Sequence, residues 1–150
     1  MVPDLRGTGL TQRTCVVPAG KALFVLVVAN ECSNIEPAPF FGDNEADLRA
    51  CAAEGFDTFG GIHRLTGDSG PIANLESYRA QTPVFTYTLP EDNLFVLPAG
   101  TTASTALSEG IFVILSLPIG EHSIVISVDS PILRTLDERY TIQVVPRGKL

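Results

Sequence analysis

The sequence lacks tryptophan, clusters of basic residues and any hydrophobic run long enough to cross a membrane. A transmembrane helix needs about 20 consecutive apolar residues, whereas the longest apolar run here, residues 22–29, has eight. Ten basic residues stand against 17 acidic ones, and the net charge is −7. Because an acidic surface repels phosphate groups and anionic lipids, we expect no nucleic-acid partner and no membrane insertion.

Motifs that mark catalysis or a cofactor are also missing. The sequence has no G-x-S-x-G nucleophile elbow, no P-loop and no G-x-G-x-x-G turn. It has two histidines, His63 and His122, and a hydrolase would have to use one of them with nearby carboxylates. A histidine without a catalytic role explains each position more simply. We therefore expect no enzyme activity and no cofactor.

The spacing of possible ligands does not support a metal site. The cysteines do not follow a C-x₂₋₄-C pattern, and neither histidine has a close cysteine neighbour. Asp43, Glu45 and Asp47 alternate as in a calcium-binding loop, but Leu48 stands where that loop requires glycine. These carboxylates suit the first turn of a helix instead, so we expect no metal.

What the sequence does contain is a series of short apolar segments between Gly- and Pro-rich turns. This pattern predicts an all-β protein, a two-layer antiparallel β-sandwich that is jelly-roll-like and forms a single domain over residues 1–150. Residues 1–11 are expected to be irregular or an edge strand. The predicted strands are residues 12–17, 22–30, 62–66, 71–73, 78–89, 94–97, 111–115, 123–128 and 140–145.

Two of these strands, residues 22–30 and 111–115, are apolar on both faces. A strand with one face in water would alternate with polar residues. We therefore expect both faces to be covered, one by a second sheet and the other by a helix or another subunit. This expectation favours a homodimer or a complex with a protein partner.

One short α-helix is predicted at about residues 44–54. Asp43 or Asn44 can cap its N-terminus, and Glu45 and Arg49 have the spacing of an ion pair on one helix face. Gly55 is expected to end the helix.

The three cysteines leave two alternatives open. Residues 18–21 have turn chemistry and are expected to join the first two strands as a hairpin, which places Cys15 too far from Cys32 for a bridge. Cys32 ends its strand and Cys51 lies on the predicted helix, so these two can meet. Either Cys32 and Cys51 form a disulfide, or all three cysteines are buried thiols.

Several turn and strand motifs of the chain occur together in one known family. The motifs are Thr14–Phe24 (T-C-V-V-P-A-G-K-A-L-F), Asn30–Cys32 (N-E-C), Phe40–Gly42, Leu48–Ala52 (L-R-A-C-A) within residues 45–52, and Gly110–Ile126 with Leu117-Pro118 and Gly120-Glu121-His122. With them the chain resembles a family of uncharacterised exported bacterial β-sandwich proteins. The resemblance implies the fold and an extracytoplasmic location, but no activity. Family members carry a leader and a further N-terminal segment with another cysteine, so the chain is expected to be N-terminally truncated, with Cys15 as the odd thiol.

These observations predict a non-enzymatic binding or structural β-sandwich module. The alternative is a sandwich that binds a small ligand or a glycan. Of the three tyrosines, Tyr87 and Tyr140 fit core faces, which leaves Tyr78 as an exposed aromatic platform for a sugar. A hydrolase that uses His63 or His122 is a third hypothesis.

Overall fold

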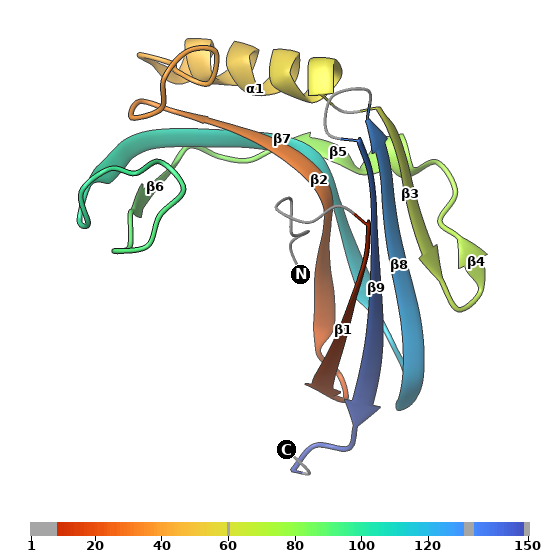
Figure 1. Ribbon diagram of the computed structural model, residues 1–150. Helices are drawn as coiled ribbons and strands as arrows, with labels where there is room; N and C mark the ends of the chain where they lie inside the picture. The colour runs from red at the N-terminus through yellow and green to blue at the C-terminus, as the bar shows by residue number, and fades with distance from the viewer. Residues whose placement is uncertain (1–8, 60, 131–133, 149–150) are drawn as a thin grey trace. The chain divides into compact units, whose positions relative to one another are not determined.

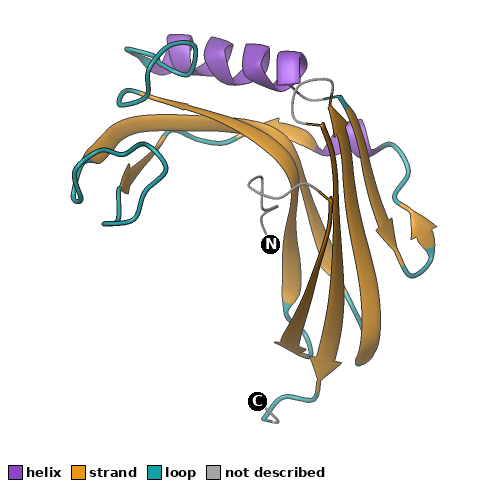
Figure 2. Cartoon of the chain, in the orientation of Figure 1, coloured by secondary structure: helices purple, strands orange, loops and turns teal. Residues whose placement is uncertain are grey.

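Residues 9–59, 61–130 and 134–148 are described by the computed structural model of the chain (Figures 1 and 2). Strands dominate, and these residues contain one α-helix. The elements in chain order are β1 (Gly9–Pro18), β2 (Ala22–Ser33), α1 (Glu45–Phe59), β3 (Ile62–Gly67), β4 (Gly70–Pro71), the short 3₁₀ helix η1 (Leu75–Tyr78), β5 (Arg79–Gln81), β6 (Phe85–Thr88), β7 (Thr102–Ser116), β8 (Gly120–Ser130) and β9 (Arg134–Val145).

Contacts within the chain group its residues into two compact units. Unit 1 consists of residues 1–28, 59–79 and 111–150, and unit 2 consists of residues 29–58 and 80–110. Strands β2 and β7 run without a break from one unit into the other. The expected single domain over residues 1–150 therefore stays a prediction, and each unit is described by itself.

Unit 1 is a two-layer β-sandwich. One layer is the five-stranded sheet with the order β1-β9-β8-β3-β4, and the other consists of the unit 1 parts of β2 and β7 (Figure 1). Alternating side chains of both layers form the core between them. The largest buried side chains of unit 1 are Val25, Val27, Leu65, Ile111, Val113, Ile124, Ile126, Tyr140 and Ile142. The predicted all-β sandwich with one helix is confirmed.

The predicted hairpin between the first two strands is wrong. β1 pairs with β9, and the pairing is parallel, with Cys15 opposite Ile142. The backbone N–H of Ala19 donates to the carbonyl of Val145 (2.8 Å), which prolongs the β1–β9 pairing into the turn. The turn at residues 18–21 then leads the chain from the sheet of β1 to the sheet of β2. The sandwich is therefore not antiparallel throughout, and its hairpin β8–β9 lies within one sheet.

The predicted edge strand near the N-terminus is present from Gly9 onward, because β1 is an outer strand of the five-stranded sheet. Residues 1–8 lie outside the described residues. The strands predicted at residues 62–66 and 71–73 correspond to β3 and to the short β4, which pair antiparallel.

Two segments predicted as strands are not continuous strands. Residues 78–89 divide into the end of η1, then β5, then β6. Pro83 lies in the gap between β5 and β6, where it cannot donate a hydrogen bond to a sheet. Residues 94–97 form an irregular loop instead of a strand, and the side chain of Asn93 replaces the sheet hydrogen bonds.

Within unit 1 of the chain itself, the strands predicted at residues 22–30 and 111–115 are covered on one face, and the predicted cover of the other face by a second subunit stays a prediction. In unit 1, Val25 and Val27 are buried, but Phe24 on the opposite face of β2 is 57% exposed and Ile114 of β7 is 69% exposed. The rings of Phe24 and Phe112 stack at 5.6 Å between their centroids. Stacking on the open face reduces the apolar area that water contacts, but Phe24 and Ile114 remain largely exposed.

Unit 2 is built around the contact between α1 and the sheet segments of β2 and β7 (Figure 2). Its core consists of the buried residues Cys32, Leu48, Ala52 and Leu107, with Phe40 and Cys51 packed against them. Cys32 and Cys51 form a disulfide, as one of the two alternatives predicted, with Cα atoms 6.2 Å apart. By the chain-entropy argument, a bridge closing a loop of this length contributes about 3 kcal/mol to the free energy of unfolding.

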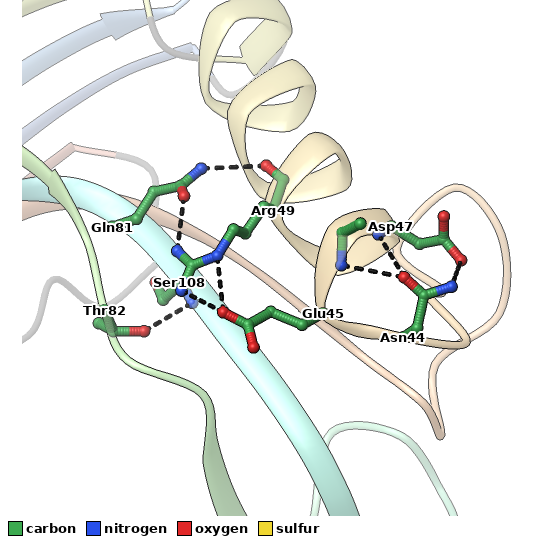
Figure 3. Close-up of polar contacts among 8 residues, drawn as sticks. Asn44, Glu45, Asp47, Arg49, Gln81, Thr82 and Ser108 are labelled. Carbon is green, nitrogen blue, oxygen red and sulfur yellow. Dashed lines mark hydrogen bonds and ion pairs between the residues drawn. The ribbon is translucent and has the colours of Figure 1, made fainter.

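Polar contacts fix α1 at its first turn and along one side (Figure 3). Asn44, not Asp43, is the capping residue, because its Oδ1 accepts the backbone N–H groups of residues 46 (2.9 Å) and 47 (3.1 Å). The predicted pair of Arg49 and Glu45 is present at 2.6 Å. Arg49 also donates to Gln81 of β5 (2.9 Å), whose amide returns a hydrogen bond to the Arg49 carbonyl (3.0 Å).

The predicted end of the helix at residue 54 is wrong, because α1 continues to Phe59. Gly55 lies inside the helix, where a Cβ atom would be 2.1 Å from Nδ2 of Asn30. The buried ring of Phe56 continues the apolar stripe beyond the glycine. Gly55 therefore serves the close approach of α1 and β2 and does not terminate the helix.

We predict that Gly55→Ala lowers the free energy of unfolding by on the order of 1–3 kcal/mol, because the added methyl group overlaps the Asn30 amide. In an Asn30→Ala background the overlap is gone, and the same substitution should stabilise the protein by up to about 1 kcal/mol through helix propensity. Urea unfolding of the four proteins measures both effects. An effect of the same sign in both backgrounds would contradict this account.

Candidate functional site

The candidate site lies in unit 2, on the face of β2 that points away from α1. Successive side chains along a strand point to opposite faces. Cys32 points toward α1, because it packs in the core that includes Leu48 and is bonded to Cys51. Glu31 and Ser33 therefore point to the other face, where Ser33 contacts Tyr87 of β6.

Ser33 is the centre of the polar contacts at this site. Its side chain is fully buried, and its hydroxyl donates to Oε2 of Glu36 (3.1 Å) and lies 3.2 Å from the hydroxyl of Tyr87. Because a serine hydroxyl has one proton, the Tyr87 hydroxyl is the donor in the second contact. Glu36 also forms a side-chain hydrogen bond with Glu31. The site thus joins β2, the loop that follows it and β6.

The two carboxyl groups are difficult to ionise together. Burial, with the hydrogen bond and the charge of Glu36, raises the pKa of Glu31 to about 8. Burial also raises the pKa of Glu36. Both shifts favour a proton held by the pair, because two adjacent carboxylates repel each other. Oε1 of Glu31 is buried and has no hydrogen-bond partner among the described residues.

A cleft of about 580 Å³ opens beside Glu36. This volume lies in the range of small-molecule binding sites, roughly 300–1,000 Å³. The cleft is lined by Ile35, Glu36, Pro37, Leu94, Phe95 and Leu97. Five of these six residues are therefore apolar, and the sixth, Glu36, belongs to the pair with Glu31.

The side chain of Asn93 organises the loop that contributes three of these lining residues. Its Nδ2 donates to the carbonyls of Pro90 (3.0 Å) and Leu97 (2.9 Å), and its Oδ1 accepts the backbone N–H groups of Phe95 (3.2 Å) and Leu97 (3.3 Å). Val96 has a φ of 56° and is 92% exposed. A β-branched residue is strained in this left-handed region, so the contacts of Asn93 must hold the loop in shape.

The two histidines lie in unit 1 and are not close to each other along the sheet. His63 of β3 is almost fully buried, and its Nδ1 is 3.2 Å from Oε1 of Glu76 in η1. His122 of β8 has both ring nitrogens occupied: Nδ1 is 2.6 Å from Oδ2 of Asp68, and Nε2 is 2.9 Å from the carbonyl of Pro118. A ring that donates from both nitrogens has no lone pair to act as a general base.

His122 and Asp68 instead form a charged pair that ties two turns of unit 1 together. The hydrogen bonds to Asp68 and Pro118 raise the pKa of His122. The backbone N–H of Ser123 and the side chain of His122 lower the pKa of Asp68. Both shifts favour the ion pair between the two side chains.

The pair predicts a pH-dependent part of the stability. Because the pKa of His122 is raised on folding, its contribution is complete below the unfolded value of about 6.5 and is lost as the pH rises through the folded value. His122→Gln should therefore destabilise the protein more at about pH 5.5 than at about pH 9. Urea unfolding of both proteins at the two pH values measures this. An equal loss at both would contradict a proton-dependent pair.

The predicted cysteines and tyrosines differ in their surroundings. Cys32 and Cys51 are bonded to each other, and Cys15 is a partly buried free thiol of β1. Tyr140 is buried, as predicted for a core face, whereas Tyr87 is half-buried and takes part in the candidate site. Tyr78 is 42% exposed in η1.

Sequence reasoning missed the residues of the candidate site. One signal was present. Glu31 directly follows a long apolar run, and it is an even number of residues from the buried Val25 and Val27, so that the alternation of the strand places it on the same face. A carboxylate there needs a partner. The pairing with Glu36 and Tyr87 could not be found, because it depends on a loop and on a strand distant in sequence.

Comparisons with protein-family models, with curated proteins and with solved structures found no match to this chain. The resemblance to exported bacterial β-sandwich proteins therefore stays a prediction. Within the described residues, α1 is too short and too polar to cross a membrane.

Proposed function

We propose that the protein is a non-enzymatic binding module that takes a small, mainly apolar ligand in the cleft of unit 2. The observation that carries the proposal is the combination of volume and lining: about 580 Å³ beside Glu36, with five apolar side chains. Small-molecule sites are typically concave and apolar, with a few polar groups that orient the ligand. The Asn93 hydrogen bonds support the proposal, because a loop held in shape before binding loses less entropy on binding.

The lining favours an apolar ligand over a glycan. A sugar presents many hydroxyl groups, and each needs a hydrogen-bond partner when it is removed from water. Glu36 is the one lining residue with a polar side chain. Tyr78, the candidate sugar platform, lies in unit 1 and does not line this cleft.

The geometry gives an enzyme less support than a binding module. A pair of carboxyl groups that shares a proton can in principle act as acid and base. A nucleophile at this site would be Ser33, but its side chain has no exposed surface and its proton is donated to Glu36. In unit 1, His122 has no free nitrogen. The hydrolase hypothesis therefore remains without a geometric argument.

The neutral compound 2-phenylethanol tests the cleft. We expect saturable binding, followed by NMR, with the largest amide shifts in residues 35–37 and 94–97. Phe95→Ala should weaken binding about tenfold or more, because a buried aromatic ring contributes roughly 1.5–3 kcal/mol.

Ile119→Ala is the matched control, because Ile119 is an exposed apolar residue of unit 1 outside the cleft. It should leave the affinity unchanged. The proposal fails if 2-phenylethanol does not saturate, or if Phe95→Ala binds it as tightly as the natural sequence.

We also propose that two copies of the chain associate through the open face of β2 and β7 in unit 1. The support is the exposure of Phe24 (57%) and Ile114 (69%) on that face. Exposed apolar side chains that gather on one face are typical of protein contact surfaces, and a two-fold dimer would place the same face of each copy in the contact.

Light scattering tests the dimer. We expect twice the mass of the 16.0 kDa chain for the natural sequence, and the mass of a single chain for Ile114→Lys, which puts a charge in the contact. Ile119→Lys changes a similarly exposed residue on a turn and should remain dimeric. A natural protein that has the mass of one chain would refute the proposal.

The Cys32–Cys51 disulfide supports the extracytoplasmic location implied by the family resemblance. Stable disulfides form in oxidising compartments and are rare in the cytosol. We therefore propose that the protein acts outside the cytoplasm.

A further inference from the structure

We propose that the cleft of unit 2 selects ligands that carry a positively charged amine next to an apolar body, and that this amine replaces the proton shared by Glu31 and Glu36. The inference rests on the proposed ligand-binding function, and it adds the chemical class of the ligand and the way in which its binding is regulated.

The first step of the argument is the position of the charge. Glu36 lines the cleft, and it is the one lining residue that can ionise. Its partner Glu31 is on β2 and is not a lining residue, and the two side chains are joined by a hydrogen bond. A cation in the cleft would therefore meet a carboxyl pair and apolar walls. A ligand that is both apolar and cationic complements both features.

The second step is the proton. Two adjacent carboxyl groups can be held together by one shared proton, because both cannot ionise without repulsion. Burial and Glu36 together raise the pKa of Glu31 to about 8. An ammonium group supplies N–H donors and a positive charge, so it can take over the role of the proton, which passes to the solvent. Amine binding and proton binding therefore compete.

The third step is the surroundings of the pair. Tyr87 from β6 is a titratable group beside both carboxyl groups. Burial raises the pKa of Tyr87, and so do the charges of Glu31 and Glu36. Ser33 adds a neutral hydroxyl bonded to Glu36. The other lining residues of the cleft are uncharged. The acidic net charge of −7 attracts cations to the protein and repels anions.

The test compares 2-phenylethylamine with 2-phenylethanol, which has the same body and no charge. An amine of this type stays protonated to about pH 9. At that pH we expect the amine to bind about tenfold tighter than the alcohol, and the preference to fall as the pH is lowered to about 5. The affinity for the alcohol should change little over the same range.

Three variants locate the effect. Glu36→Gln should abolish the preference for the amine while the alcohol still binds. Glu31→Gln removes one member of the pair, so the preference should persist to lower pH than in the natural sequence. Glu121→Gln removes an exposed carboxylate of unit 1 and serves as the control, with no expected change.

The outcomes separate this inference from the proposed function. Equal affinities for amine and alcohol at about pH 9 would overturn the amine selectivity and leave the apolar cleft standing. A preference for the amine that survives Glu36→Gln would overturn the assignment to the carboxyl pair. If neither probe binds, both the inference and the proposed function fail.

Discussion

The alternation of side chains along β2 is the constraint on which unit 2 depends. Cys32 must point toward α1, because it is bonded to Cys51 and packs against Leu48. A strand alternates strictly, so Glu31 and Ser33 have no choice but to occupy the opposite face. The disulfide that attaches the helix therefore also decides which side of the strand carries the polar cluster. The same alternation explains why residue 55 is glycine. Asn30 also points to the helix side of β2, and it can lie against α1 because Gly55 has no side chain there.

Desolvation of the carboxyl groups then determines the chemistry of that cluster. A carboxylate removed from water must find a charged or hydrogen-bonding partner or take up a proton. Glu31 does not find a cation; it finds a second carboxyl group, Glu36, and a half-buried tyrosine. A proton held between the two carboxyl groups removes the repulsion between their charges. In unit 1, by contrast, Asp68 is exposed and pairs with His122 near a neighbouring turn, so it does not have to give up its contact with water.

The parts of the fold that could be predicted are those set by local chemistry. Most of the strands, the sandwich class, the cap at Asp43 or Asn44 and the Glu45–Arg49 pair follow from patterns within about ten residues. The hairpin predicted from residues 18–21 was wrong because turn chemistry fixes a change of direction, and does not decide which strand becomes the partner. Gly55 was misread because the sequence shows a helix breaker and cannot show Asn30 against it. The candidate site could not be predicted, because the fold alone brings Glu31, Glu36 and the Asn93 loop together. The one signal in the sequence was Glu31, a carboxylate at a strand position where the alternation indicates burial.

The loop that lines the cleft contains a strained residue, Val96. Val96 is held in a backbone region that costs a β-branched residue about 1–3 kcal/mol, and its side chain is almost fully exposed, so packing returns little of that cost. Four hydrogen bonds from Asn93 keep the loop in this conformation. A loop selected only for stability would place glycine at residue 96 and turn apolar residues inward. The loop instead keeps Phe95 and Leu97 on the wall of an open cleft beside Glu36, and this arrangement supports the proposed binding function, in which the strain is the cost of a loop held ready for a ligand.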